Sequence, residues 1–266
     1  MSPEALLAHQ DEVRLWPQPL SHDPGFTLAQ AYPLALAVRR LRLARGEQAR
    51  GFKIGFTNRT IWPVYQVYAP IWGTVWDRTL AFADGVAEVS LAGCCQPRIE
   101  PELVFGMAAT PPRDPTLAQL VESIAWMAPG FEVVQCHLPD WRFQASDTVA
   151  DSGLHAWLRV GRRLPLSAIA QDAAALDEAL AQAGVTLLRN GTIVARGSGR
   201  LVLDSPLRAL QHFLADLRAC PGAPELQPGD VVTTGTWTDA WPLAAGDRYE
   251  ARFTDPLPSL TLQATA

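Results

Sequence analysis

Apolar residues recur at helical spacing in the first part of the chain. Residues 4–15 place apolar side chains among charges, and Pro17 ends the segment because proline cannot continue the helical hydrogen-bond ladder. A second helix is predicted from Thr27 to about Leu43, with Gln30 at the position that completes a capping box. The chain is therefore predicted to begin with a helical lobe.

Beyond residue 84, short apolar runs of strand length dominate the pattern. Helices are expected only at 115–127, 172–183 and 205–219. Asn190-Gly191 is typical of a type I′ hairpin between two strands. Because regular helices do not separate the strands, we expect an α+β fold with a mixed, β-rich core and not a doubly wound sheet. The expected strands are 86–91, 102–108, 131–137, 155–160, 185–189, 192–196, 231–236, 247–254 and 259–263.

The stretch from 58 to 80 shows neither helical nor strand periodicity. It follows a short glycine-punctuated strand at 51–57 and contains Trp62, Tyr65 and Trp72. Long irregular stretches in compact enzymes are often binding loops or lids. The alternative, in which these aromatic residues fill the core between two lobes, has equal weight.

Composition narrows the class of protein. The 266 residues are 48% hydrophobic with a net charge of −5, and no basic run is present, so nucleic acid and acidic membrane surfaces are not expected partners. No signal-like or membrane-spanning apolar run is present. The four cysteines form no CxxC or dense framework, as in a reducing compartment, so we expect a cytoplasmic protein.

Three glutamates are the candidate chemical centre. Glu100 and Glu102 are separated by one residue, so on a strand both side chains leave the same face. Glu132 introduces another apolar, strand-like run. Like charges on one face repel unless a cation lies between them or one is protonated, and oxygen ligands without His or Cys suit Mg²⁺ or Mn²⁺. Solvated glutamates at a strand edge are the alternative interpretation.

A series of short motifs runs in order from about residue 25 to the C-terminus: Ala31-Tyr32, Gly51–Thr57, Pro97–Glu102, Phe131–Val134, Asp140-Trp141, Asp147–Asp151, Asn190-Gly191, Gly235–Thr238 and Ala245–Asp247. In this order the motifs resemble those of the 2-keto-4-pentenoate hydratase / 4-oxalocrotonate decarboxylase family of the fumarylacetoacetate hydrolase superfamily. This resemblance implies a fumarylacetoacetase-like β-rich core with an N-terminal helical lobe. We divide the chain accordingly into residues 1–70 and 71–266, as parts of one continuous structural unit.

Roles carried over by position define the expected site. Glu100, Glu102 and Glu132 match the family's metal carboxylates, so the implied cofactor is Mg²⁺ or Mn²⁺. Lys53, the only lysine, matches its active-site lysine, and burial near a metal would lower its pKa. Asp77 lies roughly where the family has a substrate-loop acid, although the local match is poor.

Substrate contacts are expected from the loops around this centre. Thr236 and Trp237 lie in the turn that matches the one bordering the substrate carboxylate in the family, and Trp72 lies in the aromatic stretch. The family commonly has Asn-Ala-Ser after the acid at 151. An ungapped match places Leu154 where a small polar residue is usual, whereas a two-residue shift would restore Ser152.

The resemblance implies a lyase that hydrates 2-hydroxypenta-2,4-dienoate or a substituted analogue in aromatic degradation. Gln135 replaces a usual acid, and with nine tryptophans the pocket is open to a longer or more aromatic substrate. The alternatives are a 2-oxo-acid decarboxylase, an acylpyruvate C–C hydrolase, and a non-catalytic partner subunit or binder. The expected partners are the small 2-oxo or 2-hydroxydienoic acid, further copies of the chain in a homo-oligomer, and a pathway partner enzyme.

Overall fold

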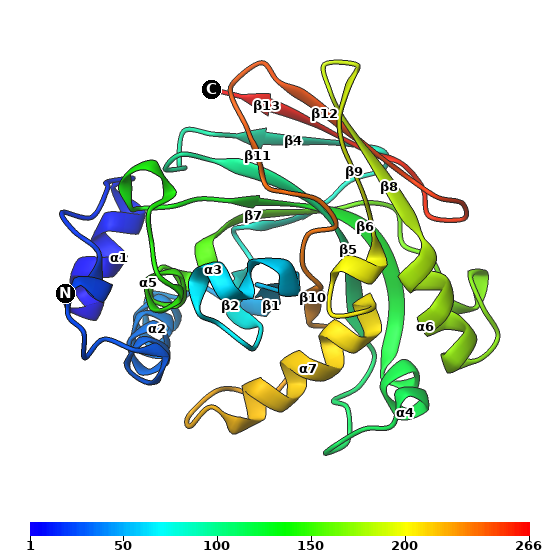
Figure 1. The fold of residues 1–266 in the computed structure, drawn as a ribbon, viewed down its shortest axis with the longest axis horizontal. Helices are drawn as coiled ribbons and strands as arrows, with labels where there is room; N and C mark the ends of the chain where they lie inside the picture. The colour runs from blue at the N-terminus through cyan, green and yellow to red at the C-terminus, as the bar shows by residue number, and fades with distance from the viewer.

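The N-terminal helices pack together on one side of the molecule. The computed structural model describes residues 1–266. Helix α2 (Leu28–Ala44) contacts both α1 (Pro3–Asp11) and the short α5 (Ala145–Ala150), as seen at the left of Figure 1. The predicted capping box of Thr27 and Gln30 is present at the start of α2. The predicted helical lobe is therefore confirmed as a group of helices.

A large curled sheet forms the centre of the fold. Its strands follow the order β2-β1-β10-β5-β6-β7-β3, and β11 also pairs with β5. Pairing is mixed, because β1 is parallel to β10 and β3 to β7, whereas the other pairs are antiparallel. The strands are β1 (Ala49–Gly55), β2 (Ile71–Trp76), β3 (Leu80–Phe82), β5 (Arg98–Met107), β6 (Ile124–Val134), β7 (His155–Val160), β10 (Val231–Thr233) and β11 (Trp241–Pro242).

A second, five-stranded sheet lies above the first in Figure 1 and follows the order β4-β13-β12-β8-β9. The β8–β9 hairpin turns at Asn190 and Gly191, both at positive φ, as a type I′ turn requires. The main core is shared by both sheets, by Leu36 of α2 and by the helices α4 (Leu117–Glu122), α6 (Ala173–Gln182) and α7 (Pro206–Ala219). The strands are β4 (Val86–Ser90), β8 (Gly184–Arg189), β9 (Thr192–Ser198), β12 (Arg248–Phe253) and β13 (Leu260–Thr265).

The α+β class and the mixed, β-rich core are confirmed, and the structure corrects three local predictions. The stretch 58–80 contains strand β2, whose six residues are all buried. A strand buried on both faces shows no alternation, so its pattern does not distinguish it from an irregular apolar segment. The predicted helix 115–127 ends at Glu122, because residues from Ile124 onward begin β6. Helix α5 was not predicted.

The expected division at residue 70 stays a prediction. Strand β1 precedes that position, yet it is hydrogen-bonded between β2 and β10 in the large sheet. The short helix α3 (Trp62–Tyr65) connects β1 to β2 and is fixed by a 2.6 Å hydrogen bond from Trp62 Nε1 to the carbonyl of Phe56. No helix is both long enough and apolar enough to cross a membrane.

Candidate active site

The three predicted carboxylates converge on one face of the large sheet. Glu100 of β5 is the direct cross-strand partner of Glu132 on β6, and Glu102 follows on the same face of β5. One carboxylate oxygen from each residue lies within 4.8 Å of the other two. Glu102 and Glu132 are fully buried, and Glu100 is partly exposed at the base of a cleft. Two adjacent strands thus bring together acids that are thirty residues apart.

Pro101 lies inside β5, where proline is unusual. Its carbonyl accepts a hydrogen bond from Trp237 N, so this edge of the residue faces the segment between β10 and β11. Those strands pair with β5 at Val104–Gly106 and at Arg98–Ile99, which leaves the ladder open around residue 101. The missing N–H of proline therefore falls where no strand partner requires it.

The buried carboxylates are only partly satisfied by the protein. Gly235 N donates to Glu102 Oε2 at 2.7 Å, and His155 Nδ1 lies 2.8 Å from Glu132 Oε1. Glu102 Oε1 has no hydrogen-bond partner, and Glu132 Oε2 has none with good geometry, although Lys53 Nζ lies 3.1 Å from it. Buried, unpartnered carboxylate oxygens are costly. Together, these atoms form a donor set that fits a hard divalent cation.

Lys53 places the only buried ammonium group beside this set. It lies on β1, is 3% exposed, and donates a 2.9 Å hydrogen bond to the carbonyl of Gly153. Burial alone would lower the pKa of Lys53, but the charges of Glu132, Glu100 and Glu102 outweigh burial and raise it. The three carboxylates alone therefore favour the charged form of Lys53, and the lowered pKa expected beside a bound metal stays a prediction.

The carboxylates differ in their protonation tendencies. Burial and the charge of Glu132 raise the pKa of Glu100 to about 7, against the opposing effect of Lys53. Burial and the neighbouring acids raise the pKa of Glu102 well above its usual range. For Glu132, burial acts in the same direction, but Lys53 and the hydrogen bond from His155 outweigh it and lower the pKa. Lys53 and His155 therefore favour the charged form of Glu132 alone, and ionising all three carboxylates would leave more negative charge than Lys53 balances.

His155 supports Glu132 from the side opposite the cleft. An ionised carboxylate only accepts hydrogen bonds, so we assign the imidazole proton to Nδ1. Nε2 lies 2.8 Å from Thr79 Oγ1, which fixes the ring at its other edge. Burial lowers the pKa of His155, although Glu132 opposes this. The neutral ring therefore orients Glu132, in the manner of the outer groups that orient metal ligands.

A left-handed turn connects this cluster to the cleft. Ser152, Gly153 and Leu154 have φ values of +56°, +69° and +64°. Consecutive left-handed residues are strained, and such strain is concentrated at functional sites. The turn presents the carbonyl of Gly153 to Lys53 and the side chain of Leu154 to the cleft. A Cβ on Gly153 would lie 3.0 Å from the Lys53 side chain, so glycine is required for this approach.

A second turn, from 234 to 240, closes the other side. Gly235 has φ +99°, and a Cβ there would lie 2.0 Å from Thr57 Oγ1. Thr234 bonds to the carbonyl of Leu103 through both its N–H (3.1 Å) and its hydroxyl (2.8 Å). The turn is thereby fixed against β5, with Thr236 facing the cleft.

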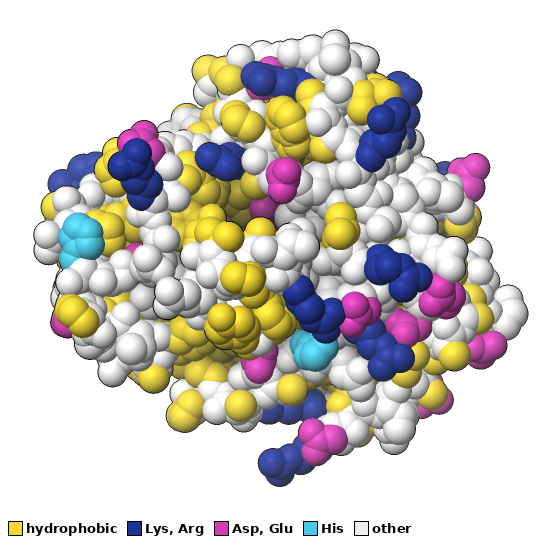
Figure 2. Space-filling model, in the orientation of Figure 1, with side chains coloured by type: hydrophobic (Ala, Val, Ile, Leu, Met, Phe, Trp, Pro, Cys, Tyr) yellow, Lys and Arg dark blue, Asp and Glu magenta, His cyan; other side chains and the backbone are white.

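The resulting opening, here called the front cleft, has a volume of about 440 Å³ and is lined by twenty residues. Lys53 and Glu100 lie at its base, and half of the lining residues are hydrophobic. Figure 2 shows a hollow on this face of the molecule with hydrophobic side chains around its walls. An apolar cleft with a few charged groups at its base is the usual arrangement of a small-molecule site.

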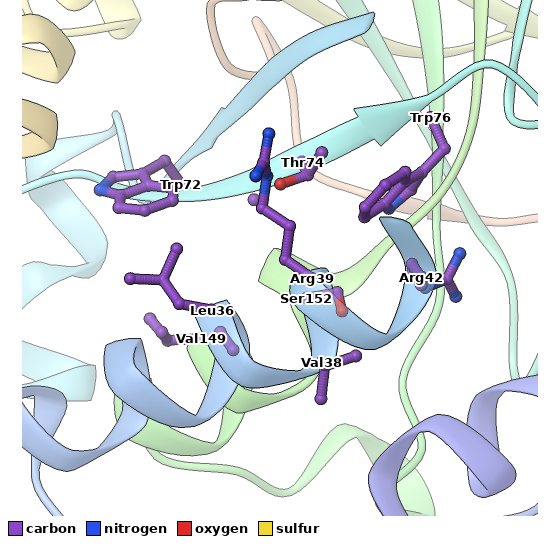
Figure 3. Close-up of a pocket in the computed structure, with 11 residues that line it drawn as sticks. Leu36, Val38, Arg39, Arg42, Trp72, Thr74, Trp76, Val149 and Ser152 are labelled. Carbon is purple, nitrogen blue, oxygen red and sulfur yellow. The ribbon is translucent and has the colours of Figure 1, made fainter. Parts of the chain in front are cut away.

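The residues expected to contact the substrate lie in different parts of the structure. Thr236 lines the front cleft, but Trp237 is fully buried in the core against Phe253, so its predicted position is wrong. Trp72 and Ser152 face a small cavity of about 20 Å³ between β2 and α2, shown in Figure 3. Leu154 lines the front cleft, as the ungapped match to the family motif predicts. Ser152, which the shifted match would place there, instead accepts a hydrogen bond from Gln10.

Asp77 also lies outside the front cleft. It follows the far end of β2, where its carboxylate accepts a 3.1 Å hydrogen bond from Gln48 N. Ile71, at the opposite end of β2, is the residue of this strand that lines the cleft. Side chains alternate along a strand, so Ile71 and Trp72 face opposite sides.

His155 is the main residue that the sequence analysis missed. It has no metal-ligand spacing to another histidine, and no local signal distinguishes it from a core or surface histidine. Gln135, flagged as a replaced acid, accepts from Cys95 N at 3.1 Å. Both residues line a separate opening of about 190 Å³ on the other side of the turn at 152–154, which we call the rear cleft.

Comparison with known proteins agrees with this arrangement. Residues 70–263 match the family described as fumarylacetoacetate (FAA) hydrolase C-terminal. The chain is 33% identical over 230 residues to a 2-hydroxyhexa-2,4-dienoate hydratase of Comamonas testosteroni, covering 85% of this chain and 83% of the relative. It is 34% identical over 226 residues to a 2-keto-4-pentenoate hydratase of Dechloromonas aromatica, with coverages of 83% and 80%.

A solved structure extends the likeness to almost the whole chain. The 4-oxalocrotonate decarboxylase from Pseudomonas putida G7, complexed with magnesium and adipate, superposes with a TM-score of 0.87 at 25% identity. The match covers 98% of this chain and 95% of that one. The family match spans more than half of the residues and includes all three clustered glutamates. The chain therefore belongs to the fumarylacetoacetate hydrolase C-terminal family.

Proposed function

We propose that this protein is a divalent-metal-dependent hydro-lyase that hydrates 2-hydroxypenta-2,4-dienoate, or a substituted analogue, to a 4-hydroxy-2-oxo acid. The observation that carries the proposal is the buried convergence of three carboxylates beside one buried lysine. The hydratase names of two relatives support the reaction class.

Glu100, Glu102 and Glu132 would hold the cation, with Mg²⁺ or Mn²⁺ proposed from the all-oxygen donor set. When bound, a divalent ion supplies Lewis-acid stabilisation of the negative charge that develops on the 2-oxygen of the substrate. His155 keeps Glu132 oriented through its 2.8 Å contact. Gly235 N does the same for Glu102 through its 2.7 Å hydrogen bond.

Lys53 is the proposed proton carrier. Hydration requires a proton at C5 to give the 2-oxo-3-enoate, after which water supplies the hydroxyl group to C4 and a proton to C3. The ammonium group is oriented by Gly153 O and Glu132, so its third hydrogen remains free for the substrate. Thr236 lies at the side of the cleft, where its hydroxyl donates a 2.9 Å hydrogen bond to the carbonyl of Thr238, and we propose that it exchanges this bond for one to the substrate carboxylate.

Decarboxylation is the second candidate, and the likeness to the decarboxylase structure favours keeping it. Loss of CO₂ needs the same stabilised charge but no attacking water. A C–C hydrolase has less support. It would need a His/Glu pair that activates water in the cleft, and the His155–Glu132 pair turns its histidine toward the rear cleft. A non-catalytic binder is a third alternative, which retained metal binding without turnover would favour.

We also propose where the protein acts and what it associates with. We propose a cytoplasmic location, because all four cysteines are unpaired. Homo-oligomer formation and association with a pathway partner enzyme are proposed from the family resemblance. The substrate is proposed to be the only small-molecule partner, without nucleic acid or membrane.

The decisive experiment follows the ultraviolet absorbance of 2-hydroxypenta-2,4-dienoate with purified protein and added Mg²⁺ or Mn²⁺. Turnover is expected with metal and should disappear with EDTA or in the double variant Glu102→Gln/Glu132→Gln. Hydration gives the 4-hydroxy-2-oxo acid, whereas CO₂ release from 2-oxohex-3-enedioate would indicate the decarboxylase. Undiminished turnover in the double variant would overturn the metal-centred mechanism.

A further inference from the structure

Four aromatic side chains form a continuous chain of ring contacts along the front cleft. Phe56 contacts Tyr65 at 5.1 Å between ring centroids, Tyr65 stacks on Phe143 at 5.2 Å, and Phe143 contacts Trp141 at 6.2 Å. These residues come from the end of β1, from α3 and from the loop after β6, and all line the cleft. We call this set the aromatic arc.

Aliphatic side chains fill the space beside the aromatic arc. Leu154 and Val134 belong to one buried cluster against which Trp141 and Phe143 pack. Ile71 lines the cleft from β2, and Ile61 lines it from the 3-10 turn just before α3. Segments far apart in the sequence therefore contribute one connected apolar surface. This surface is not used only for packing inside the core, because its side chains line an open volume of about 440 Å³.

Most of the charged residues that line the cleft lie beside the three clustered glutamates, at the end that we call the metal end. Lys53 and Glu100 lie at the base, and Arg98 lies two residues before Glu100 on the same face of β5. The guanidinium of Arg98 is positioned over the ring of Trp141 at 4.3 Å. The fourth charge is Asp239, an acid, which would repel a second substrate carboxylate. Arg98 is thus the only cation beside the aromatic arc, at its Trp141 end, and no cation lines the cleft beside Phe56, Tyr65 or Phe143.

We propose that the aromatic arc and Leu154 bind an uncharged hydrocarbon tail, aryl or alkyl, on the far carbon of the dienoate. This inference rests on the proposed function and specifies its substrate class. An apolar surface gains from burying hydrocarbon, whereas a carboxylate beside Phe56, Tyr65 and Phe143, away from Arg98, would lose its hydration without a partner. We therefore expect substrates with a second carboxylate to be poorer than substrates with a hydrocarbon tail.

The test compares three dienoates under saturating metal: 2-hydroxypenta-2,4-dienoate, 2-hydroxyhexa-2,4-dienoate with a phenyl group on C6, and 2-hydroxymuconate. We expect kcat/KM for the phenyl compound to exceed that of the unsubstituted one by about tenfold or more, mainly through KM. 2-Hydroxymuconate should be the poorest of the three. A preference for it, or no gain from the phenyl group, would overturn the inference.

Variants locate the effect in the cleft. Phe143→Ala should lower the ratio of the two kcat/KM values, phenyl over unsubstituted, by about tenfold. Leu154→Ser should lower the same ratio. Phe82→Ala is the matched control, because Phe82 contacts Trp126 on a strand away from the cleft and should leave the ratio unchanged. An unchanged ratio in Phe143→Ala and Leu154→Ser would refute the assignment of the tail to this surface.

Binding separates this inference from the proposed function. If no dienoate is turned over, the proposed function fails, but the tail preference can still be measured by calorimetry with Mg²⁺ and three stable 2-oxo acids. We expect 2-oxo-6-phenylhexanoate to bind more tightly than 2-oxopentanoate and 2-oxoadipate, with the advantage reduced in Phe143→Ala. Equal affinities would overturn the inference.

Discussion

The two ends of the front cleft are built in different ways. At the metal end, Lys53, Glu100 and Glu132 project from strands of one sheet, and the side chains of Lys53 and Glu132 are fixed by an ion pair and by hydrogen bonds to Gly153 and His155. At the other end, the aromatic arc is assembled from α3, the end of β1 and the loop after β6. Strands hold reacting groups to a fixed geometry, whereas loops vary without disturbing it.

This difference predicts two kinds of functional change. Substitutions at the metal end should affect every substrate in the same way, because they alter the chemistry. Substitutions in the aromatic arc should change the ranking of substrates, because they alter only the contacts of the tail. Substitutions of residues that support both ends of the cleft should mainly lower the free energy of unfolding.

The largest loss is expected for Lys53→Met. It removes the ammonium while keeping the length of the side chain, so turnover of every dienoate should fall by about 10²–10⁴-fold. The three carboxylates lose their only buried cation, so the affinity for Mn²⁺, measured by calorimetry, should rise or stay unchanged. Arg50→Met is the matched control, because Arg50 is exposed on the same strand. Retained turnover in Lys53→Met would remove the lysine from the mechanism.

A smaller effect is expected for His155→Ala. Loss of the 2.8 Å contact leaves Glu132 without its orienting group, so the Kd for Mn²⁺ should increase by about 10–100-fold. Turnover at saturating metal should recover in large part, which separates a positioning role from a catalytic one. His212→Ala, at an exposed position on α7, serves as the control. If the Kd does not change, the orienting role of His155 is wrong.

The same contrast explains what the sequence could predict. Glu100 and Glu102 share a face by strand alternation, and Glu132 and Lys53 follow from the family motifs, so the metal end was accessible from sequence. The aromatic arc was not, because its contacts join segments with no common periodicity. Trp72 shows the limit most clearly: in a strand buried on both faces, residue type does not reveal which side faces a cleft.

His155 and Trp237 were misjudged for a related reason. The contact between His155 and Glu132 depends on the register of β6 and β7, which includes an irregularity between Val133 and Val134. Register comes from tertiary pairing and is not encoded in spacing along the chain. Trp237 lies next to Thr236 in the sequence, yet the tight turn directs one side chain to the cleft and the other to the core.

A buried ion pair links the supports of both ends, and its effect should depend on pH. His137 contacts Asp151 at 2.7 Å, joining the segment before the aromatic-arc loop to the turn at 152–154. Burial alone would lower the pKa of His137, but Asp151 outweighs it and raises it to about 10. The value in the unfolded chain is about 6.5.

Because the folded pKa is the higher one, protonated His137 stabilises the fold fully below about pH 6.5, and this contribution is lost as the pH rises toward 10. His137→Asn should therefore lower the free energy of unfolding by about 2–3 kcal/mol at pH 6. The difference from the unchanged protein should shrink steadily up to pH 10 in urea titrations. A difference that is independent of pH would show that the pair is not ionic.

The smallest effect is expected for Asp77→Asn, which separates sequence position from position in space. Asp77 lies away from the cleft and accepts a hydrogen bond from Gln48 N, so kcat/KM should stay within about twofold and stability within about 1 kcal/mol. Asp239→Asn is the matched comparison, because Asp239 lines the cleft. Removing its charge should improve kcat/KM for 2-hydroxymuconate relative to the unsubstituted dienoate. A tenfold loss in Asp77→Asn with no change in Asp239→Asn would mean that the substrate lies along β2 and not along the aromatic arc.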